Sequence, residues 1–154
     1  MNLPRFSLLL IGLATLLPRA HAEDAGEADS HHPNYVAVFA GAASEDRRES
    51  GGALGIEYER RLNSAFGIGA LVERTFGDID TTVYAAPLAY HSGAWKIYAA
   101  PGFERGDAGS DSLLRLGLEY GFAAGDWEIS PQIDVDFVDG DRVLVLGITF
   151  GQGF

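Results

Sequence analysis

The sequence predicts an all-β fold, an eight-stranded antiparallel up-and-down β-barrel that crosses a membrane with its strands. Three observations support this prediction. Turn-like clusters recur about every dozen residues from residue 34 onward and divide the chain into eight segments. Within most segments, large apolar residues alternate with small or charged ones, which is the period of a strand. A compact apolar segment near the N-terminus predicts that the protein is exported.

Residues 1–22 have the pattern of a secretory signal peptide. Arg5 gives a short basic start, an apolar run follows over residues 7–17, and Ala20 and Ala22 are small residues at the positions that signal peptidase reads. We therefore expect cleavage after Ala22. The apolar run is about half as long as a membrane-spanning helix, and an uncleaved anchor is the alternative. Residues 23–33 are polar and predict a flexible lead-in, which leaves residues 34–154 for the barrel.

Composition restricts the possible functions. The chain has no cysteine, so neither disulfides nor thiol chemistry are available. It carries 22 acidic residues against 11 Lys and Arg, a formal net charge of −11. Removing the signal peptide removes two arginines and no acid, which leaves −13. This charge argues against nucleic acid as a partner, because phosphate backbones are bound through positive charge.

Seven turn-like clusters separate the eight expected strands. Each is rich in Gly, Asn, Asp or Ser, the residues that tight turns prefer. They lie at residues 44–50, 63–64, 77–80, 92–93, 106–112, 125–126 and 139–141. The intervening segments are about as long as tilted membrane strands.

Alternation between the turns is clearest in the seventh segment. Apolar Trp127, Ile129, Ile133, Val135 and Phe137 alternate there with Glu128, Ser130, Gln132, Asp134 and Asp136. The second, third, fifth, sixth and eighth segments repeat this pattern. The first and fourth segments are weaker, and the faces of the first segment are not assigned.

The composition of the two faces predicts which one points outward. One face is large and apolar, whereas the other sets Gly and Ala among charged residues. A soluble barrel, the rival fold, would place its apolar face inside. The interior of a small barrel has room only for short residues and paired charges. The pattern therefore favours an apolar exterior in lipid.

The separators predict the orientation of the barrel in the membrane. The first, third, fifth and seventh are mostly longer and charged, as expected for outer loops, whereas the others are short, as expected for periplasmic turns. Aromatic residues near strand ends predict two membrane girdles. We expect Phe66, Tyr90, Trp95, Phe122 and Trp127 on the periplasmic side and Phe76, Phe103 and Phe137 on the outer side.

From residue 34 to Phe154 the chain resembles the small eight-stranded outer-membrane barrels of the OmpA and OmpX kind. The most specific element of this resemblance is the alternation of Leu146, Ile148, Phe150 and Phe154 at the C-terminus. The resemblance implies that Ile148, Phe150 and Phe154 form the signal read by the barrel-insertion machinery. Gln152 departs from the usual apolar residue in that signal. The implied location is the outer membrane of a Gram-negative cell, with periplasmic chaperones as transient partners.

The inward-facing charged residues are the main candidate site. Eight acids and only three bases are expected inside, where an isolated charge is costly and must be paired. We interpret them as an ion-pair network that fills the lumen. A narrow cation-preferring path and a site for a divalent ion are the alternatives. The residues are Glu57, Glu59, Arg61, Glu73, Lys96, Glu104, Arg115, Glu119, Glu128, Asp134 and Asp136.

No catalytic, metal-binding or cofactor-binding residues are assigned. Small barrels of this class that act on lipid A use a Ser with a His and an acid. His31 and His32 fall in the lead-in, and His91 falls at a predicted periplasmic turn, away from outer-leaflet chemistry. Three prolines interrupt predicted strands, and we expect local bulges there; a lateral weak point that admits a lipid tail is the alternative. They are Pro87, Pro101 and Pro131.

The expected function is non-enzymatic. We expect a porin-like, surface-exposed barrel, a monomer with a filled polar lumen, that contributes to envelope integrity or surface interaction. A small channel is the second hypothesis and a lipid A-acting enzyme the third. The expected lasting partners are outer-membrane lipids and lipopolysaccharide.

Overall fold

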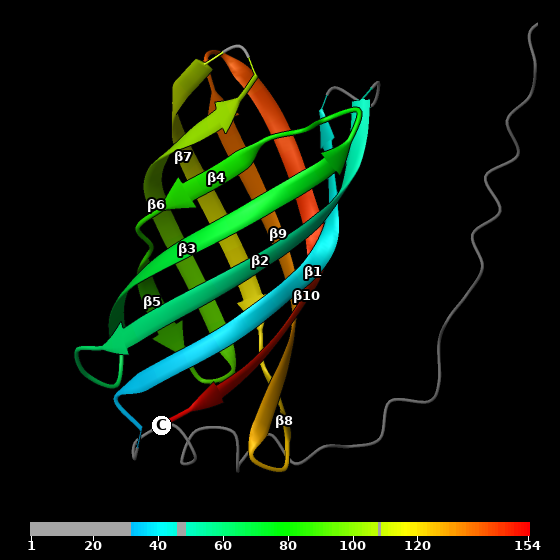
Figure 1. Ribbon diagram of the computed structural model, residues 1–154. Helices are drawn as coiled ribbons and strands as arrows, with labels where there is room; N and C mark the ends of the chain where they lie inside the picture. Colours follow the sequence, from blue (N-terminus) through cyan, green and yellow to red (C-terminus); the bar gives the residue numbers. More distant parts are fainter. Residues whose placement is uncertain (1–31, 46–48, 108) are drawn as a thin grey trace, which may run out of the picture.

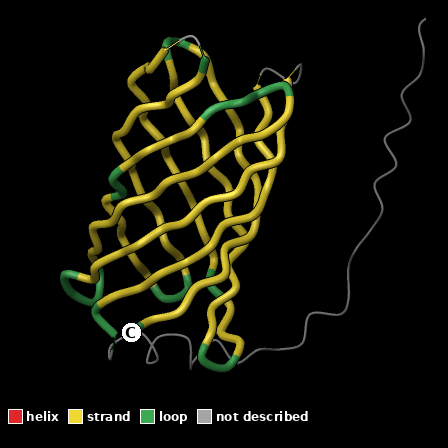
Figure 2. The backbone as a smooth tube through the Cα atoms, viewed as in Figure 1, coloured by secondary structure: helices red, strands yellow, loops and turns green. Residues whose placement is uncertain are grey.

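The computed structural model describes residues 32–45, 49–107 and 109–154. The predicted signal peptide and most of the lead-in lie outside these residues. The described residues are almost entirely strand, and they contain no helix (Figure 2). No helix in these ranges is long and apolar enough to cross a membrane.

Ten strand elements follow one another along the chain (Figure 1). They are β1 (Asn34–Glu45), β2 (Glu49–Arg61), β3 (Phe66–Gly77), β4 (Thr82–Ala85), β5 (Leu88–Ser92), β6 (Trp95–Gly106), β7 (Gly109–Tyr120), β8 (Phe122–Ala124), β9 (Trp127–Val138) and β10 (Asp141–Gly153). β4 and β5 both pair with β3 and β6, and β7 and β8 both pair with β9. Each of these couples is therefore one interrupted strand, and the barrel has the eight strands that the sequence predicts.

All neighbouring strands are antiparallel, and pairing of β10 with both β9 and β1 closes the sheet into a barrel. Partners followed once around the barrel from Asn34 lead back to β1 at Ser44, ten residues further along. This stagger makes the strands tilt by roughly 35–45° and sets the barrel diameter together with the strand number. An eight-stranded barrel of this kind has an interior only wide enough for its own side chains.

The closing seam between β1 and β10 depends on two glycines. Gly41 and Gly147 are partners in the ladder, and both face inward. A Cβ added at either glycine would collide with the Phe39 ring and with backbone atoms of the other strand. The missing side chains therefore let the Phe39 ring, which is 5% exposed, lie across the seam inside the barrel.

The two ends of the barrel are distinguished by the chain termini. The terminal end, lower in Figure 1, carries the start of β1, the C-terminus and the turns at residues 62–65, 93–94 and 125–126. The loop end carries the other four connections. Most residues of the charged separators continue the strands, so that only residues 78–81, 107–108 and 139–140 connect three of these hairpins. The ladder extends because each added pair satisfies backbone groups that an open loop would leave to water.

The prediction of bulges at the prolines is wrong. β4 and β5 have the same register with β3, and also the same register with β6, on the two sides of Pro87. The ladders that contain Pro101 and Pro131 likewise keep one register throughout. The prolines instead remove single hydrogen bonds. Ala86 N donates to Pro101 O at 2.9 Å, but Pro101 has no N–H to return the bond. This explains why β4 and β5 are separated at Ala86 and Pro87.

Candidate functional site in the barrel lumen

All eleven predicted lumen residues occupy inward positions of the ladder. Eight of them are buried charged side chains, whereas Arg61, Glu104 and Glu128 are half-buried towards the ends. Asp134 is 0% exposed and Arg115 is 1% exposed. Side chains this deep need partners, since the cost of removing a charge from water is several kcal/mol.

Arg115 on β7 lies at the centre of the first charge cluster. Its guanidinium donates two hydrogen bonds of 2.9 Å to Glu73 on β3 and bonds of 2.6 and 2.7 Å to Asp136 on β9. Asp134 lies 3.7 Å from the same group. The planar guanidinium holds both carboxylates in bidentate geometry, which couples β3, β7 and β9 across the lumen.

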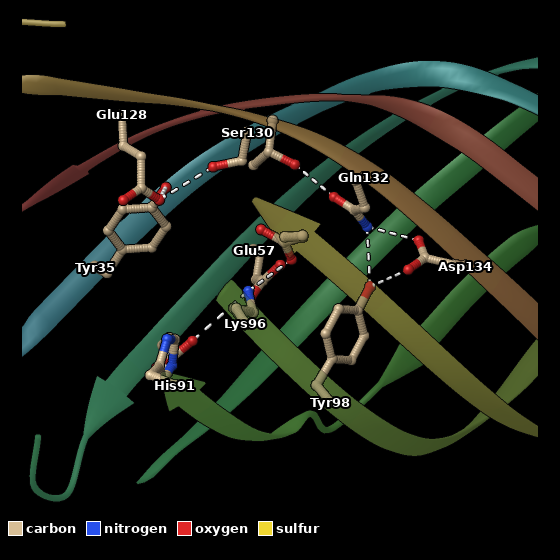
Figure 3. Close-up of polar contacts among 12 residues, drawn as sticks. Tyr35, Glu57, His91, Lys96, Tyr98, Glu128, Ser130, Gln132 and Asp134 are labelled. Carbon is tan, nitrogen blue, oxygen red and sulfur yellow. Dashed lines mark hydrogen bonds and ion pairs between the residues drawn. The ribbon is translucent and has the colours of Figure 1, made fainter. Parts of the chain in front are cut away.

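A chain of neutral donors continues from this cluster towards the terminal end (Figure 3). The Tyr98 hydroxyl donates to Asp134 at 2.6 Å, and Gln132 Nε2 donates to Tyr98 at 2.9 Å and to Asp134 at 2.6 Å. Thr149 on β10 donates to Gln132 Oε1 at 2.5 Å. Each buried polar group here is satisfied by the next, so the network fixes one arrangement of side chains.

Lys96 on β6 is the centre of the second charge cluster. Its Nζ lies 2.5 Å from Glu57, 2.8 Å from Glu119 and 3.6 Å from Glu59. His91 Nε2 lies 2.7 Å from Glu59 Oε1, and Arg61 Nε lies 2.9 Å from the same oxygen. One lysine thus compensates parts of three carboxylates, and His91 and Arg61 share the carboxylate of Glu59.

Glu128 forms a separate group with neutral partners at the terminal end. Tyr35 and Ser130 each donate a hydrogen bond of 3.1 Å to its Oε1. An added Cβ at Gly121 would lie 2.7 Å from the Glu128 Cδ, so the glycine makes room for this side chain. Beside it, a cavity of about 300 Å³ opens towards the terminal end and is lined by Glu59, Arg61, His91, Lys96, Glu119 and Glu128, among others.

Apolar side chains pack together inside the loop end of the lumen. Ile79, from the connection between β3 and β4, is 7% exposed and packs in one cluster with Phe39, Val143 and Val145. A second cluster along the neighbouring wall includes Leu113 and Val138. Inside the acidic rim of the loop end, the lumen therefore changes along its axis from the cluster around Ile79, which we call the apolar cap, through two charge clusters, to a polar cavity.

Several residues of the network were not assigned from the sequence. Tyr35 was missed because the faces of the first strand show little contrast in size. His91 was expected at a turn, yet it is the last inward residue of β5, where it follows inward Ala89 by two positions. Counting every second residue from Ala89 would have placed His91 on the inward face. Tyr98, Gln132 and Thr149 are neutral and carry no charge signal.

The exterior carries the predicted aromatic residues. All eight predicted girdle residues point outward, with side chains 38–55% exposed: Phe66, Phe76, Tyr90, Trp95, Phe103, Phe122, Trp127 and Phe137. Tyr120 joins them at the terminal end, with ring centroids 4.7 Å from Trp95 and 4.8 Å from Phe122. Ile148, Phe150 and Phe154 also point outward. Recognition of these three residues by the barrel-insertion machinery remains a prediction.

The described residues do not form a serine-based catalytic group. The Ser130 hydroxyl bonds to Glu128, and His91 bonds to Glu59, so in residues 32–45, 49–107 and 109–154 no serine is hydrogen-bonded to a histidine. Nor do three or more His, Cys, Asp or Glu residues in these ranges gather as ligands for a metal ion.

An apolar exterior around a polar, filled lumen defines an eight-stranded transmembrane β-barrel. Solved structures with this fold include neisserial surface protein A (TM-score 0.60, 16% identity) and Ail, the attachment invasion locus protein of Yersinia pestis (TM-score 0.54, 14% identity), each covering 79% of this chain and 97% of its own. The N-terminal barrel domain of Pseudomonas aeruginosa OprF has a TM-score of 0.52 at 14% identity over 78% of this chain and 98% of its own. The predicted resemblance to small outer-membrane barrels is confirmed at the level of the fold. No protein-family model and no curated protein matches the sequence.

Proposed function

We propose that this protein is an exported outer-membrane barrel that does not conduct ions and contributes to envelope integrity or surface interaction. The observation that carries this proposal is the combination of a closed apolar exterior with a lumen filled by buried ion pairs. The apolar cap around Ile79, which lies between the charge clusters and the loop end, supports a lumen that does not conduct.

Location in the outer membrane is supported by the fold. A closed barrel leaves no strand edge in lipid, and its outward side chains form an apolar band between aromatic residues. Cleavage after Ala22 and delivery by periplasmic chaperones belong to the same proposal. Fractionation tests it: we expect the protein in the outer membrane, with different gel migration before and after heating. Recovery of a soluble, monomeric protein after signal removal would contradict the proposal.

A narrow cation-preferring channel is the second candidate, and the excess of acids inside the barrel favours it. The eight acids of the predicted lumen set accompany only Arg61, Lys96 and Arg115, and the cavity at the terminal end is open. Planar-bilayer recording separates the two candidates. We expect no discrete conductance steps from the wild-type protein; reproducible, cation-selective steps would establish the channel instead.

Catalysis on lipid A is not part of the proposal. Two described histidines, His32 and His91, line the cavity at the terminal end, and His91 is paired with Glu59. Mass analysis of lipid A from expressing and deleted cells tests this point. We expect identical lipid A profiles, and a new or missing acyl chain would identify an enzyme.

A further inference from the structure

The sign of a charged residue in the strands depends on the face where it lies. Every acidic residue of the described strands occupies an inward position of the ladder, including Glu45, Glu49, Asp111 and Asp141 at the rim. The outward charged positions of the described strands are all arginines: Arg60, Arg74, Arg105 and Arg142. In a chain with twice as many acids as bases, this separation is unexpected for a surface that only meets water.

Two of these arginines flank one hydroxyl at the loop end. Thr82 on β4 is the ladder partner of Arg74 on β3 and of Arg105 on β6. The three side chains therefore form an outward row, with the two arginine backbones about 10 Å apart, which is twice the spacing between strands. We call this row the Arg74–Thr82–Arg105 row.

The row borders the apolar band. The next outward pair towards the terminal end is Tyr84 and Phe103, whose rings stack with centroids 5.1 Å apart. Arg74 also lies over the Phe76 ring, at 5.9 Å from its centroid. Arginines just beyond an aromatic girdle lie at the depth of lipid headgroups when the band lies in the membrane core.

The guanidinium groups of both arginines have N–H groups that can donate hydrogen bonds to a ligand. Arg105 is exposed, and Arg74 is 42% exposed while it donates to Thr82 Oγ1 at 3.0 Å. Arg74 also forms an ion pair with Asp80, which is 56% exposed. Guanidinium groups bind phosphate oxygens in bidentate geometry, and the hydroxyl between them adds a further polar contact. Asp80 is then the carboxylate with which a phosphate must compete.

We propose that the Arg74–Thr82–Arg105 row binds a phosphate group in the headgroup of a lipid that packs against the barrel wall. A lipid is the source that fits, because its acyl chains would lie along the outward side chains of Val72, Tyr84 and Phe103 below the row. This inference rests on the proposed membrane location and adds a specific lipid partner to it.

The test compares bis-phosphorylated lipid A with its dephosphorylated form. Protein purified from membranes of expressing cells is mixed with each lipid in detergent micelles, and bound lipid is quantified by native mass spectrometry. We expect the phosphorylated lipid to bind at least about tenfold more tightly, since two charge-assisted contacts are gained. The Arg74→Gln/Arg105→Gln double variant should lose that difference, and Asp80→Asn should increase it.

Arg142→Gln is the matched control, because Arg142 is also an outward arginine at the loop end but lies outside the row. It should bind the phosphorylated lipid like the wild type. Equal binding of both lipids by the wild type would overturn the proposal without any variant. So would an effect of Arg142→Gln as large as that of the double variant, or displacement of the lipid by equimolar inorganic phosphate. A protein without a heat-modifiable folded form would instead contradict the proposed membrane location.

Discussion

Arg115 and Glu73 face each other across the lumen, joined by two hydrogen bonds of 2.9 Å between strands that are not neighbours. Arg115 also holds Asp136, so one guanidinium neutralises two carboxylates that would otherwise be buried without a counter-charge. Such a group stabilises the barrel mainly by preventing the cost of unpaired charges.

Replacement of Arg115 by Gln should therefore destabilise the barrel by about 3–5 kcal/mol, the usual cost of removing one partner from a buried ion pair. Urea unfolding in detergent, followed by tryptophan fluorescence, measures this change. Arg142→Gln removes an exposed arginine of the same barrel and should change stability by less than about 0.5 kcal/mol. Equal unfolding curves for the two variants would show that the Arg115 network does not support the fold.

Tyr98→Phe tests the neutral part of the network. The Tyr98 hydroxyl donates to Asp134 and accepts from Gln132, so its removal leaves both groups short of a partner inside the barrel. We expect a loss of about 1–3 kcal/mol in unfolding free energy. Tyr90→Phe is the control, because Tyr90 points outward. A loss as large in Tyr90→Phe would assign the effect to the aromatic exterior rather than to the lumen.

Gly147→Ala tests the closing seam. Its new Cβ would lie 2.5 Å from Ala40 O on β1 and would press on the Phe39 ring. Overpacking of this kind costs about 1–3 kcal/mol, and we expect a lower fraction of heat-modifiable, folded protein. Gly52→Ala introduces the same methyl group where no atom lies within 4 Å. If both variants fold equally well, the seam tolerates a side chain and the two glycines have another role.

Pro101→Ala tests the interruption between β4 and β5. An alanine N–H at this position can donate to Ala86 O and complete the pair that Ala86 N already forms with Pro101 O. We expect slower hydrogen exchange at the amide of Ala86, whereas Val135 and Leu144, which pair on the other side of the barrel, should not change. Unchanged exchange at Ala86 would mean that Pro87 alone breaks the strand.

The fold could be predicted because its signals are local. Turn residues at regular spacing and period-two alternation are properties of neighbouring residues, and in an up-and-down barrel neighbours in sequence are also neighbours in the sheet. The segment from Trp127 to Phe137 illustrates this, since its large apolar residues face outward and its charged residues face the lumen. Pairing of the first strand, β1, with the last strand, β10, then closes the barrel.

The composition of the lumen was less accessible from the sequence. Glu128 bonds to Tyr35, which lies 93 residues earlier, and such contacts depend on the stagger of the whole barrel rather than on any short pattern. The apolar cap was also missed, because inward Val143 and Val145 appear in a strand that is apolar on both faces. Ile79 gave no signal, since a turn residue is not expected to fold back into the lumen.

The apolar cap over the lumen has a consequence for how the interior meets its surroundings. Because the cavity opens at the terminal end and apolar side chains pack inside the loop end, the carboxylates beside the cavity meet solvent from the terminal end. The polar part of the lumen is thus asymmetric, and its cavity faces the solution at one end of the barrel.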